Sequence, residues 1–302
     1  MTRAIELVEV GPRDGLQNES LIVSTDDKVE LIRRCVAAGA RRIEVASFVN
    51  PRKVPQMADA EAVVEALGEV EGVTRIGLVL NLRGAERALA CGIDQLGSVA
   101  VASDAFGIRN QGQTSAQSAQ EAARIVALAR SAGRTAQVTI ATAFGCPFQG
   151  AVDPAHVVSM AKALAASGPV EIALADTIGV AVPAEVTRLV HQVQQAVTPL
   201  PVRVHFHDTR NTGLANVWAA VEAGAATVDA SLGGLGGCPF APGAAGNVGT
   251  EDVAYLLERS GIATGLDLDR LIAASQWLSG VMGKPLPASV SRARGFPAGD
   301  QA

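Results

Sequence analysis

IELVEVGPRDGLQ (Ile5–Gln17) is an apolar run followed by a turn rich in glycine and charge. An open, doubly wound α/β sheet usually carries the fingerprint GxGxxG after its first strand, where a dinucleotide binds. Here the same position reads GPRDGLQ. The first turn of the chain therefore disfavours the open sheet, and the rest of the sequence has to support another parallel fold.

Apolar runs of five to eight residues recur along the chain and alternate with segments whose apolar residues repeat at helical spacing. Strict alternation demands parallel strands, because each helix carries the chain back to the start of the sheet. Eight such units close most economically into a (β/α)8 TIM barrel. The expected strands are Ile5–Val10, Arg42–Ser47, Arg75–Leu80, Leu96–Ala102, Gln137–Ala143, Glu171–Asp176, Val202–His207 and Thr227–Leu232.

Helix ends are marked by a small residue followed by glycine just before several strands, because glycine takes the left-handed conformation that stops a helix. The clearest expected helices are Asp27–Ala38, Ala184–Val197, about Thr250 to Arg259, and Asp267–Met282. The glycine stops are Ala38-Gly39, Cys91-Gly92, Ala132-Gly133, Ser167-Gly168 and Ala223-Gly224. We expect one α/β domain over residues 1–302, with the barrel at about 1–262 and a helical extension and tail at about 263–302.

Composition excludes several classes of protein. Hydrophobic residues make up 48% of the chain and charged residues 18%, which suits a large buried core. The net charge of -5 and the lack of a basic stretch argue against a nucleic-acid partner. No apolar run approaches a membrane span, and the start shows no targeting segment, so we expect a cytoplasmic protein. The four cysteines form no CxxC pair, so a disulfide framework is not expected.

The strongest chemical signal is VHFHD (Val204–Asp208), at the end of the seventh expected strand. Residues i and i+2 of a strand point to the same side, so His205 and His207 project together. Imidazole is the commonest neutral metal ligand, and the C-terminal end of a barrel strand is where this fold places its active sites. Two polar residues that only close the barrel mouth are the alternative.

Charged residues also follow or lie within other expected strands. Asp14 could complete a His-His-carboxylate set, and the planar fork of Arg13 suits an oxyanion or a carboxylate. Glu44 and Asp176 are flanked by apolar runs, where a charge is costly unless it is paired or bound to metal. Ordinary ion pairs are the alternative for all of them, and a supporting role beside Arg13 or the histidines would also serve function.

A glycine-rich loop, Gly233–Gly249, follows the eighth expected strand. Glycine lets backbone approach a ligand closely and lets a lid move. Cys238 lies in the middle of this loop, where a thiol with a tuned pKa could transfer protons, although a cysteine in such a loop is more often incidental. Asn247, at the end of the loop, offers a neutral oxygen as a further metal ligand.

These segments together resemble the 3-hydroxy-3-methylglutaryl-CoA lyase family of metal-dependent barrel enzymes. The resemblance covers nearly the whole expected barrel, in the expected order. It is carried by EVGPRDGLQNE (Glu9–Glu19), SFVNPRKVPQM (Ser47–Met57), FGCPFQG (Phe144–Gly150), LADTIGV (Leu174–Val180), HFHDT (His205–Thr209), GLGGCPFAPGAAGN (Gly234–Asn247) and TED (Thr250–Asp252).

The resemblance implies a role for each matching residue. It implies Mg²⁺ or Mn²⁺ held by Asp14, His205, His207 and Asn247. It implies a catalytic set of Arg13, which stabilises an enolate, and Cys238, with Asp14, His205, Glu44 and Asp176. We expect substrate contacts from Arg13, Gln17, Ser47, Arg210 and Asn211, and weaker phosphate contacts from Arg52 and Lys53. An acyl-CoA partner and a homodimer are what the family suggests.

The chain departs from the family after the metal histidines. The usual continuation is HDTYGQALAN, whereas this chain reads HDTRNTGLAN (His207–Asn216). Arg210 and Asn211 bring a new cation and amide, which leaves the metal chemistry intact and opens the choice of acyl group.

The expected reaction is cleavage of 3-hydroxy-3-methylglutaryl-CoA, or a close analogue, to acetyl-CoA and a keto acid. A citramalyl-CoA-type lyase is one alternative. A condensing synthase of the isopropylmalate or homocitrate type is another, although such enzymes usually carry an extra regulatory domain. A non-catalytic metal- or acyl-CoA-binding module is the third.

Overall fold

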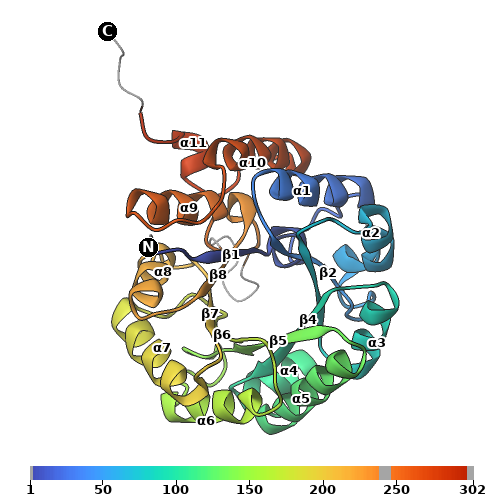
Figure 1. The fold of residues 1–302 in the computed structure, drawn as a ribbon, viewed down its shortest axis with the longest axis vertical. Helices are drawn as coiled ribbons and strands as arrows, with labels where there is room; N and C mark the ends of the chain where they lie inside the picture. The colour runs from blue at the N-terminus through green and yellow to red at the C-terminus, as the bar shows by residue number, and fades with distance from the viewer. Residues whose placement is uncertain (1–2, 238–245, 298–302) are drawn as a thin grey trace.

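Eight parallel strands form a closed barrel in the computed structural model, which describes residues 3–237 and 246–297. Each strand pairs with the next, and β8 closes the barrel on β1 (Figure 1). The strands are β1 (Glu6–Glu9), β2 (Arg42–Ser47), β3 (Thr74–Val79), β4 (Gln95–Val101), β5 (Thr135–Ala141), β6 (Ile172–Asp176), β7 (Val202–Phe206) and β8 (Thr227–Ala230). The predicted TIM barrel is confirmed, with every predicted strand within two residues of its observed bounds.

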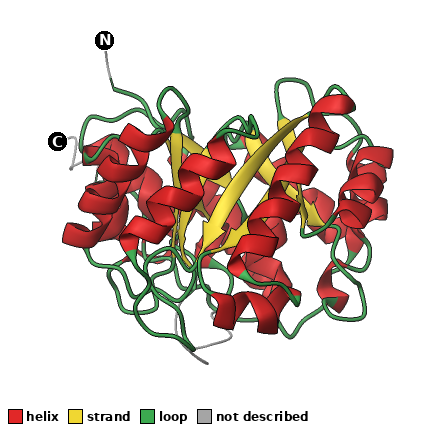
Figure 2. Ribbon diagram, turned by 90° about the horizontal axis from the view of Figure 1, so that it is seen from below, coloured by secondary structure: helices red, strands yellow, loops and turns green. Residues whose placement is uncertain are grey.

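Helices form a ring around the strands, which Figure 2 shows from the side. The ring consists of α1 (Thr25–Ala37), α2 (Ala60–Leu67), α3 (Leu82–Ala90), α5 (Ser115–Ser131), α6 (Pro154–Ala165), α7 (Pro183–Val197), α8 (Gly213–Glu222) and α9 (Thr250–Arg259). A shorter helix, α4 (Asp104–Gln111), lies between β4 and α5 in the chain. The predicted helical extension is α10 (Leu268–Met282), which packs against α1 and α9, followed by α11 (Val290–Ala293) (Figure 1). None of the helices described here is long and apolar enough to cross a membrane.

Glycine ends several helices where the sequence predicts it. Gly39, Gly92, Gly133, Gly168 and Gly224 all take positive φ values, from 68° to 105°. A residue with a side chain would be strained in this conformation. These stops explain why short loops can lead each helix back to the next parallel strand.

The inside of the barrel carries buried charge. Along β7, Val202, Val204 and Phe206 belong to the apolar core shared with the helices, so the two-residue period turns Arg203 and His205 inward. Arg203 is fully buried and donates to Asp229 of β8. TIM barrels usually fill this space with branched apolar side chains. The inward charges therefore need partners inside the barrel, and they have them.

Two buried carboxylates, Glu9 at the end of β1 and Glu251 in α9, have no cation partner among the described residues. Glu9 accepts hydrogen bonds from the backbone N–H of Gly11 and of Leu232, at 2.8 Å each, and from the Thr250 hydroxyl at 2.7 Å. Glu251 accepts from the Gly233 N–H at 2.9 Å. Burial raises the pKa of both carboxyls from 4.5 to about 7.

The raised pKa of Glu9 predicts how the stability of the fold changes with pH. Because the folded pKa lies above the unfolded one, the contribution of this group to stability is full below about pH 4.5 and is lost as the pH rises through about 7. The substituted side chain of Glu9→Gln stays neutral, so the variant does not lose stability in this way. We therefore expect the free energy of unfolding of the variant minus that of the native protein to increase between pH 5 and pH 8, by on the order of 2–3 kcal/mol. Urea unfolding at both pH values measures this difference. A pH-independent difference would contradict the prediction, and the exposed Glu185→Gln serves as the control.

Candidate active site and metal centre

A tight turn after β1 places Arg13 and Asp14. The turn is η1 (Gly11–Gly15), a π-helical segment in which the Val10 carbonyl accepts from the N–H groups of Arg13, Asp14 and Gly15 at 2.7–3.2 Å. Pro12 lies in its first turn, where its missing N–H costs nothing. Glycine is required at Gly11, since a Cβ atom there would lie 2.6 Å from the Glu9 carboxylate. The segment Gly11–Gly15 thus places the side chains of Arg13 and Asp14 over the barrel mouth.

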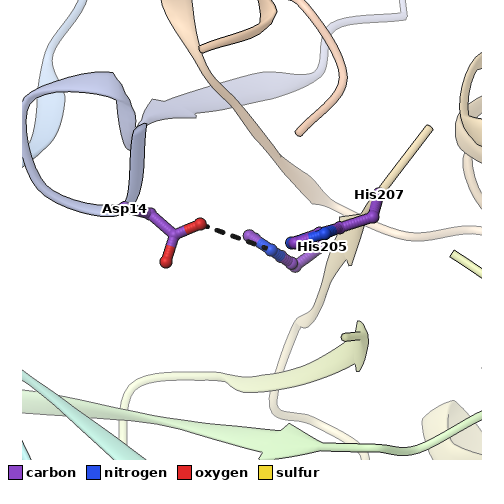
Figure 3. Close-up of side chains that lie close together, drawn as sticks. All are labelled: Asp14, His205 and His207. Atoms are coloured by element: carbon purple, nitrogen blue, oxygen red, sulfur yellow. Dashed lines mark ion pairs between the residues drawn. The ribbon is translucent and has the colours of Figure 1, made fainter. Parts of the chain in front are cut away.

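Two histidines from the end of β7, which is separated from β1 by β8 alone, meet Asp14. Figure 3 shows His205 and His207, from the end of β7, facing the Asp14 carboxylate. Asp14 Oδ2 lies 4.0 Å from His205 Nε2, and each of the three side chains offers a ligand atom within 4.8 Å of the others. Residues far apart in the chain therefore converge at one rim, as the sequence predicts, in an arrangement that could hold a metal ion.

Asn247 lies beside this triad. An antiparallel bridge joins its backbone to that of His207, and its Nδ2 donates to Asp14 Oδ2 at 2.9 Å and to the Leu235 carbonyl at 3.2 Å. Its Oδ1 is buried without a hydrogen-bond partner among the described residues. A buried oxygen without a partner is costly, and a cation would satisfy it. Carboxylate and amide oxygens with imidazole nitrogens fit Mg²⁺ or Mn²⁺.

Electrostatics keep two of the candidate ligands, Asp14 and His207, in the forms that bind metal. Burial alone would raise the pKa of Asp14, but Arg13 and the two histidines hold it well below its usual range. Burial, with the charge of His205, lowers the pKa of His207 to about 4. At neutral pH the carboxylate is therefore ionised and His207 is neutral, as metal ligands must be. For His205, burial is outweighed by the hydrogen bond to Asp229 and the charge of Asp14, so its pKa is raised.

Arg13 is held rigidly beside the triad. Its Nε donates to Glu44 Oε2 at 2.7 Å, its Nη2 also donates to Glu44, and its Nη1 donates to Asp14. Arg13 and Glu44 are 8% and 3% exposed, so the pair is nearly dry. These bonds use three of the five guanidinium N–H groups. Two N–H groups remain without a partner in the described part of the chain.

A cavity of about 680 Å³ opens above these residues. Its floor includes Arg13, Asp14, Glu44, His205 and His207, and Gln17 also lines it. The wall carries two cations, Lys53 and Arg109, next to apolar side chains such as Leu78 and Val101. Lys53, one of the two residues for which the sequence suggests a phosphate contact, lines this cavity, whereas Arg52 is not among the lining residues.

Other predicted site residues lie elsewhere. Asp176 shares the outer face of β6 with Ile172 and Leu174, and its carboxylate accepts from the N–H groups of Val180 and Ala181 at 2.9 Å. It is fully buried and does not line the cavity.

Three expected substrate contacts also lie outside the cavity lining. Ser47 is buried, and its hydroxyl has no partner among the described residues. Arg210 donates to the carbonyls of Ile178 and Gly179 at 2.9 and 2.8 Å. Asn211 has a φ of 57°, the left-handed conformation that glycine adopts most easily, where the family usually has glycine. Cys238 lies outside the described residues.

Asp229 and Arg203 are site residues that sequence reasoning missed. Asp229 Oδ2 lies 3.2 Å from His205 Nδ1, and Arg203 Nη1 donates to both carboxylate oxygens of Asp229, at 2.8 and 3.1 Å. The signal was available, since Arg203, His205 and His207 share one side of β7 by the two-residue period. Asp229 sits in an apolar run, TVDASL, where a charge calls for a partner.

Fold and site together define a class: a (β/α)8 barrel with a candidate divalent-metal centre at the C-terminal rim, where such barrels hold their active sites. Residues 4–278 match the family described as HMGL-like. The chain belongs to this family.

Known proteins that are similar to this chain in sequence or structure include several acyl-CoA lyases. The (R)-citramalyl-CoA lyase of Chloroflexus aurantiacus is 45% identical, over 96% of this chain and 95% of that protein. The hydroxymethylglutaryl-CoA lyase YngG of Bacillus subtilis is 39% identical, over 94% of this chain and 95% of its own. The structure of an HMG-CoA lyase from Acinetobacter baumannii, in complex with coenzyme A and 3-methylmalate, superposes with a TM-score of 0.93. It is 40% identical and covers 99% of this chain and 98% of that one.

Proposed function

We propose that this protein is a metal-dependent lyase that cleaves the C2–C3 bond of 3-hydroxy-3-methylglutaryl-CoA or a close 3-hydroxyacyl-CoA analogue. The products are acetyl-CoA and a keto acid, acetoacetate in the first case. The observation that carries the proposal is the convergence of Asp14, His205 and His207 beside Arg13 on the floor of one cavity. Asn247 completes the proposed ligand set, and Mg²⁺ or Mn²⁺ is the proposed ion.

The reaction needs a Lewis acid, a base, an acid and a group that stabilises an enolate. The C3 hydroxyl loses its proton and becomes a carbonyl, the C2–C3 bond breaks, and its electron pair moves onto the thioester as an enolate. A bound divalent cation would supply Lewis-acid polarisation of the substrate's hydroxyl. Asp14 and His205 are the two side chains proposed to take the hydroxyl proton, since both reach the cavity floor. An acid then protonates C2 to give acetyl-CoA.

Arg13 is the proposed enolate-stabilising residue. Its guanidinium is nearly buried, permanently charged and anchored by Glu44, with two N–H groups still available. A fixed donor in a dry site stabilises developing negative charge more than water does, because it needs no reorganisation. Gln17 lies in the same cavity wall as a proposed substrate contact. Lys53 and Arg109 are proposed to meet phosphates of coenzyme A.

Two further residues and an oligomeric state are also proposed. Cys238 is proposed to take part in proton transfer, and Asp176 to support the rim by holding the backbone after β6. A homodimer is proposed from the family, and light scattering after size-exclusion chromatography tests it.

A specific observation favours a second substrate. The citramalyl-CoA lyase named above is 45% identical to this chain, and citramalyl-CoA differs from 3-hydroxy-3-methylglutaryl-CoA by one methylene before the distal carboxylate. Both thioesters have the tertiary C3 hydroxyl that the site is proposed to deprotonate. Citramalyl-CoA would release pyruvate in place of acetoacetate. Pocket contacts discriminate a single methylene by only about 1–3 kcal/mol, so both substrates deserve assay.

The test is a panel of 3-hydroxyacyl-CoA thioesters with Mg²⁺ or Mn²⁺. We expect acetyl-CoA release, with acetoacetate or pyruvate in equal amount, and loss of turnover after chelation that either ion restores. The larger kcat/KM of the two identifies the substrate. No acetyl-CoA from any thioester, or full activity after chelation, would overturn the proposal. Net condensation of acetyl-CoA with a keto acid would identify a synthase instead.

A further inference from the structure

The two histidines of the triad are held in different ways. His205 has its Nδ1 atom 3.2 Å from Asp229 Oδ2, while its Nε2 atom lies 4.0 Å from Asp14 Oδ2. The Nδ1 atom of His207 is buried and has no hydrogen-bond partner in the described part of the chain. Only His205, of the two, thus has a carboxylate behind it. The two nitrogens of its ring face different carboxylates, one below the site and one within it.

Asp229 is itself fixed from below. Arg203 Nη1 donates to both of its oxygens, at 2.8 and 3.1 Å, and Arg203 Nη2 donates to the Thr139 hydroxyl at 3.0 Å. Arg203 and Asp229 are 0% and 4% exposed. A guanidinium held on two strands leaves the carboxylate little freedom to rotate away.

The same chain of charges continues to the base of the barrel. Glu171 forms an ion pair with Arg203 Nε at 3.2 Å, and its carboxylate also accepts from Arg42. Arg42 donates further to the side-chain carbonyls of Gln95 and Gln137, at 3.0 and 2.8 Å. Charges alternate in sign along this column, so each buried group has a counter-charge. The column runs from the base of the barrel to the back of His205.

We propose that Asp229 is a positioning residue that sets the tautomer of His205, with Arg203 holding it in place. A carboxylate can only accept, so it keeps the proton on Nδ1 and leaves the lone pair of Nε2 facing Asp14 and the cation site. Carboxylates behind metal-binding histidines fix ring orientation and tautomer in this way. The proposal rests on the metal-dependent function proposed above. In it, Arg203 acts only by holding Asp229.

Nitrogen NMR of the histidine rings tests the tautomer directly. The chain has four histidines, so single His→Gln variants of His156, His191 and His207 allow the rings to be assigned. In the native protein with bound Mg²⁺ we expect His205 to carry its proton on Nδ1, with a downfield-shifted proton that reports the bond to Asp229. A proton on Nε2 of His205 in the native protein overturns the proposal without any change at Asp229.

Asp229→Asn tests the residue itself, because an amide can donate to Nδ1 and so release the other tautomer. We expect the NMR signal of the Nδ1 proton to weaken or vanish, and Mn²⁺ measured without substrate to bind about 10- to 100-fold more weakly. An Mn²⁺ dissociation constant within twofold of the native value overturns the proposal. Asp94→Asn is the matched control, since Asp94 pairs with the buried Arg75 but lies next to no histidine of the site; it should leave Mn²⁺ binding unchanged.

Two further outcomes are informative. If Asp229→Asn does not fold, Asp229→Glu keeps the charge for Arg203 and should retain the Nδ1 proton of His205; a switch to Nε2 with the carboxylate still present overturns the proposal. If the native protein binds neither Mg²⁺ nor Mn²⁺, the proposed function fails. If it binds them equally well with and without Asp229, only the present inference fails.

Discussion

Replacing Asp14 with asparagine is expected to lower metal-dependent turnover by about 1000-fold or more, equivalent to about 4 kcal/mol. Asp14 is the only carboxylate in the candidate triad, so the change removes the one anionic ligand from a site with two neutral imidazoles. The neutral side chain also stops opposing the charge of Arg13. Measurements of kcat/KM over a Mn²⁺ series, together with Mn²⁺ binding without substrate, check both parts of the expectation.

Folding should survive this change. Arg13 keeps its two hydrogen bonds to Glu44 when the Asp14 charge is removed. The melting temperature should therefore move by only a few degrees. Asp104→Asn is a suitable control, because Asp104 starts α4 and accepts from the Ser115 N–H without lining the cavity. Native activity and native Mn²⁺ affinity in Asp14→Asn would show that the ligand assignment is wrong.

The fold could be predicted because its signals are local and repeated. Parallel strands buried on both faces read as short apolar runs, and the stops at residues such as Gly39 and Gly224 are set by backbone sterics alone. The observed strand bounds differ from the predicted ones by at most two residues. The first strand ends at Glu9, one residue earlier than predicted, because Val10 already gives its carbonyl to the π-helical turn. A hydrogen-bond pattern of that kind produces no periodic pattern of apolar residues in the sequence.

The site could be predicted where residue type and strand position agree. His205 and His207 lie at the end of β7 and share a side, so chemistry and geometry point the same way. Asp176 differs from them, because counting by two along β6 places it on the outer face with Ile172 and Leu174. Chemistry alone suggested the mouth, and strand parity would have placed it outside.

The turn after the metal histidines departs from the family for a conformational reason. Arg210 binds two backbone carbonyls after β6, so its charge serves the loop as observed and not the cavity. Asn211 takes the left-handed conformation that asparagine tolerates better than most residues. The departure therefore gives no direct information on the acyl group. Substrate choice instead depends on residues that line the cavity.

The buried column below His205 could not be read as a unit from the sequence. Glu171 directly precedes β6, Arg203 and Asp229 lie in β7 and β8, and barrel closure brings Arg42 of β2 to them. Each one, taken singly, reads as a charge at the edge of an apolar run. Their pairing depends on register between neighbouring strands, such as His205 opposite Asp229, which no local pattern encodes.

Arg13→Lys is expected to lower kcat by about 100- to 1000-fold while Mn²⁺ binding changes by only a few fold. Lysine keeps the positive charge beside Glu44 and Asp14, so the fold and the ligand charges are preserved. It cannot reproduce a fork that donates to Glu44 and still has N–H groups left for a substrate oxygen. The loss should thus fall on the transition state, where negative charge develops on the thioester oxygen, and less on ground-state binding.

Arg109→Lys gives the contrast, because Arg109 lines the same cavity but lies over the ring of Phe148, 4.0 Å from its centroid. It is expected to raise KM for the thioester and to leave kcat nearly unchanged. Steady-state kinetics with saturating Mn²⁺ separates the two effects. If Arg13→Lys raised KM alone, Arg13 would bind the substrate equally in ground and transition states, and another donor would have to stabilise the enolate.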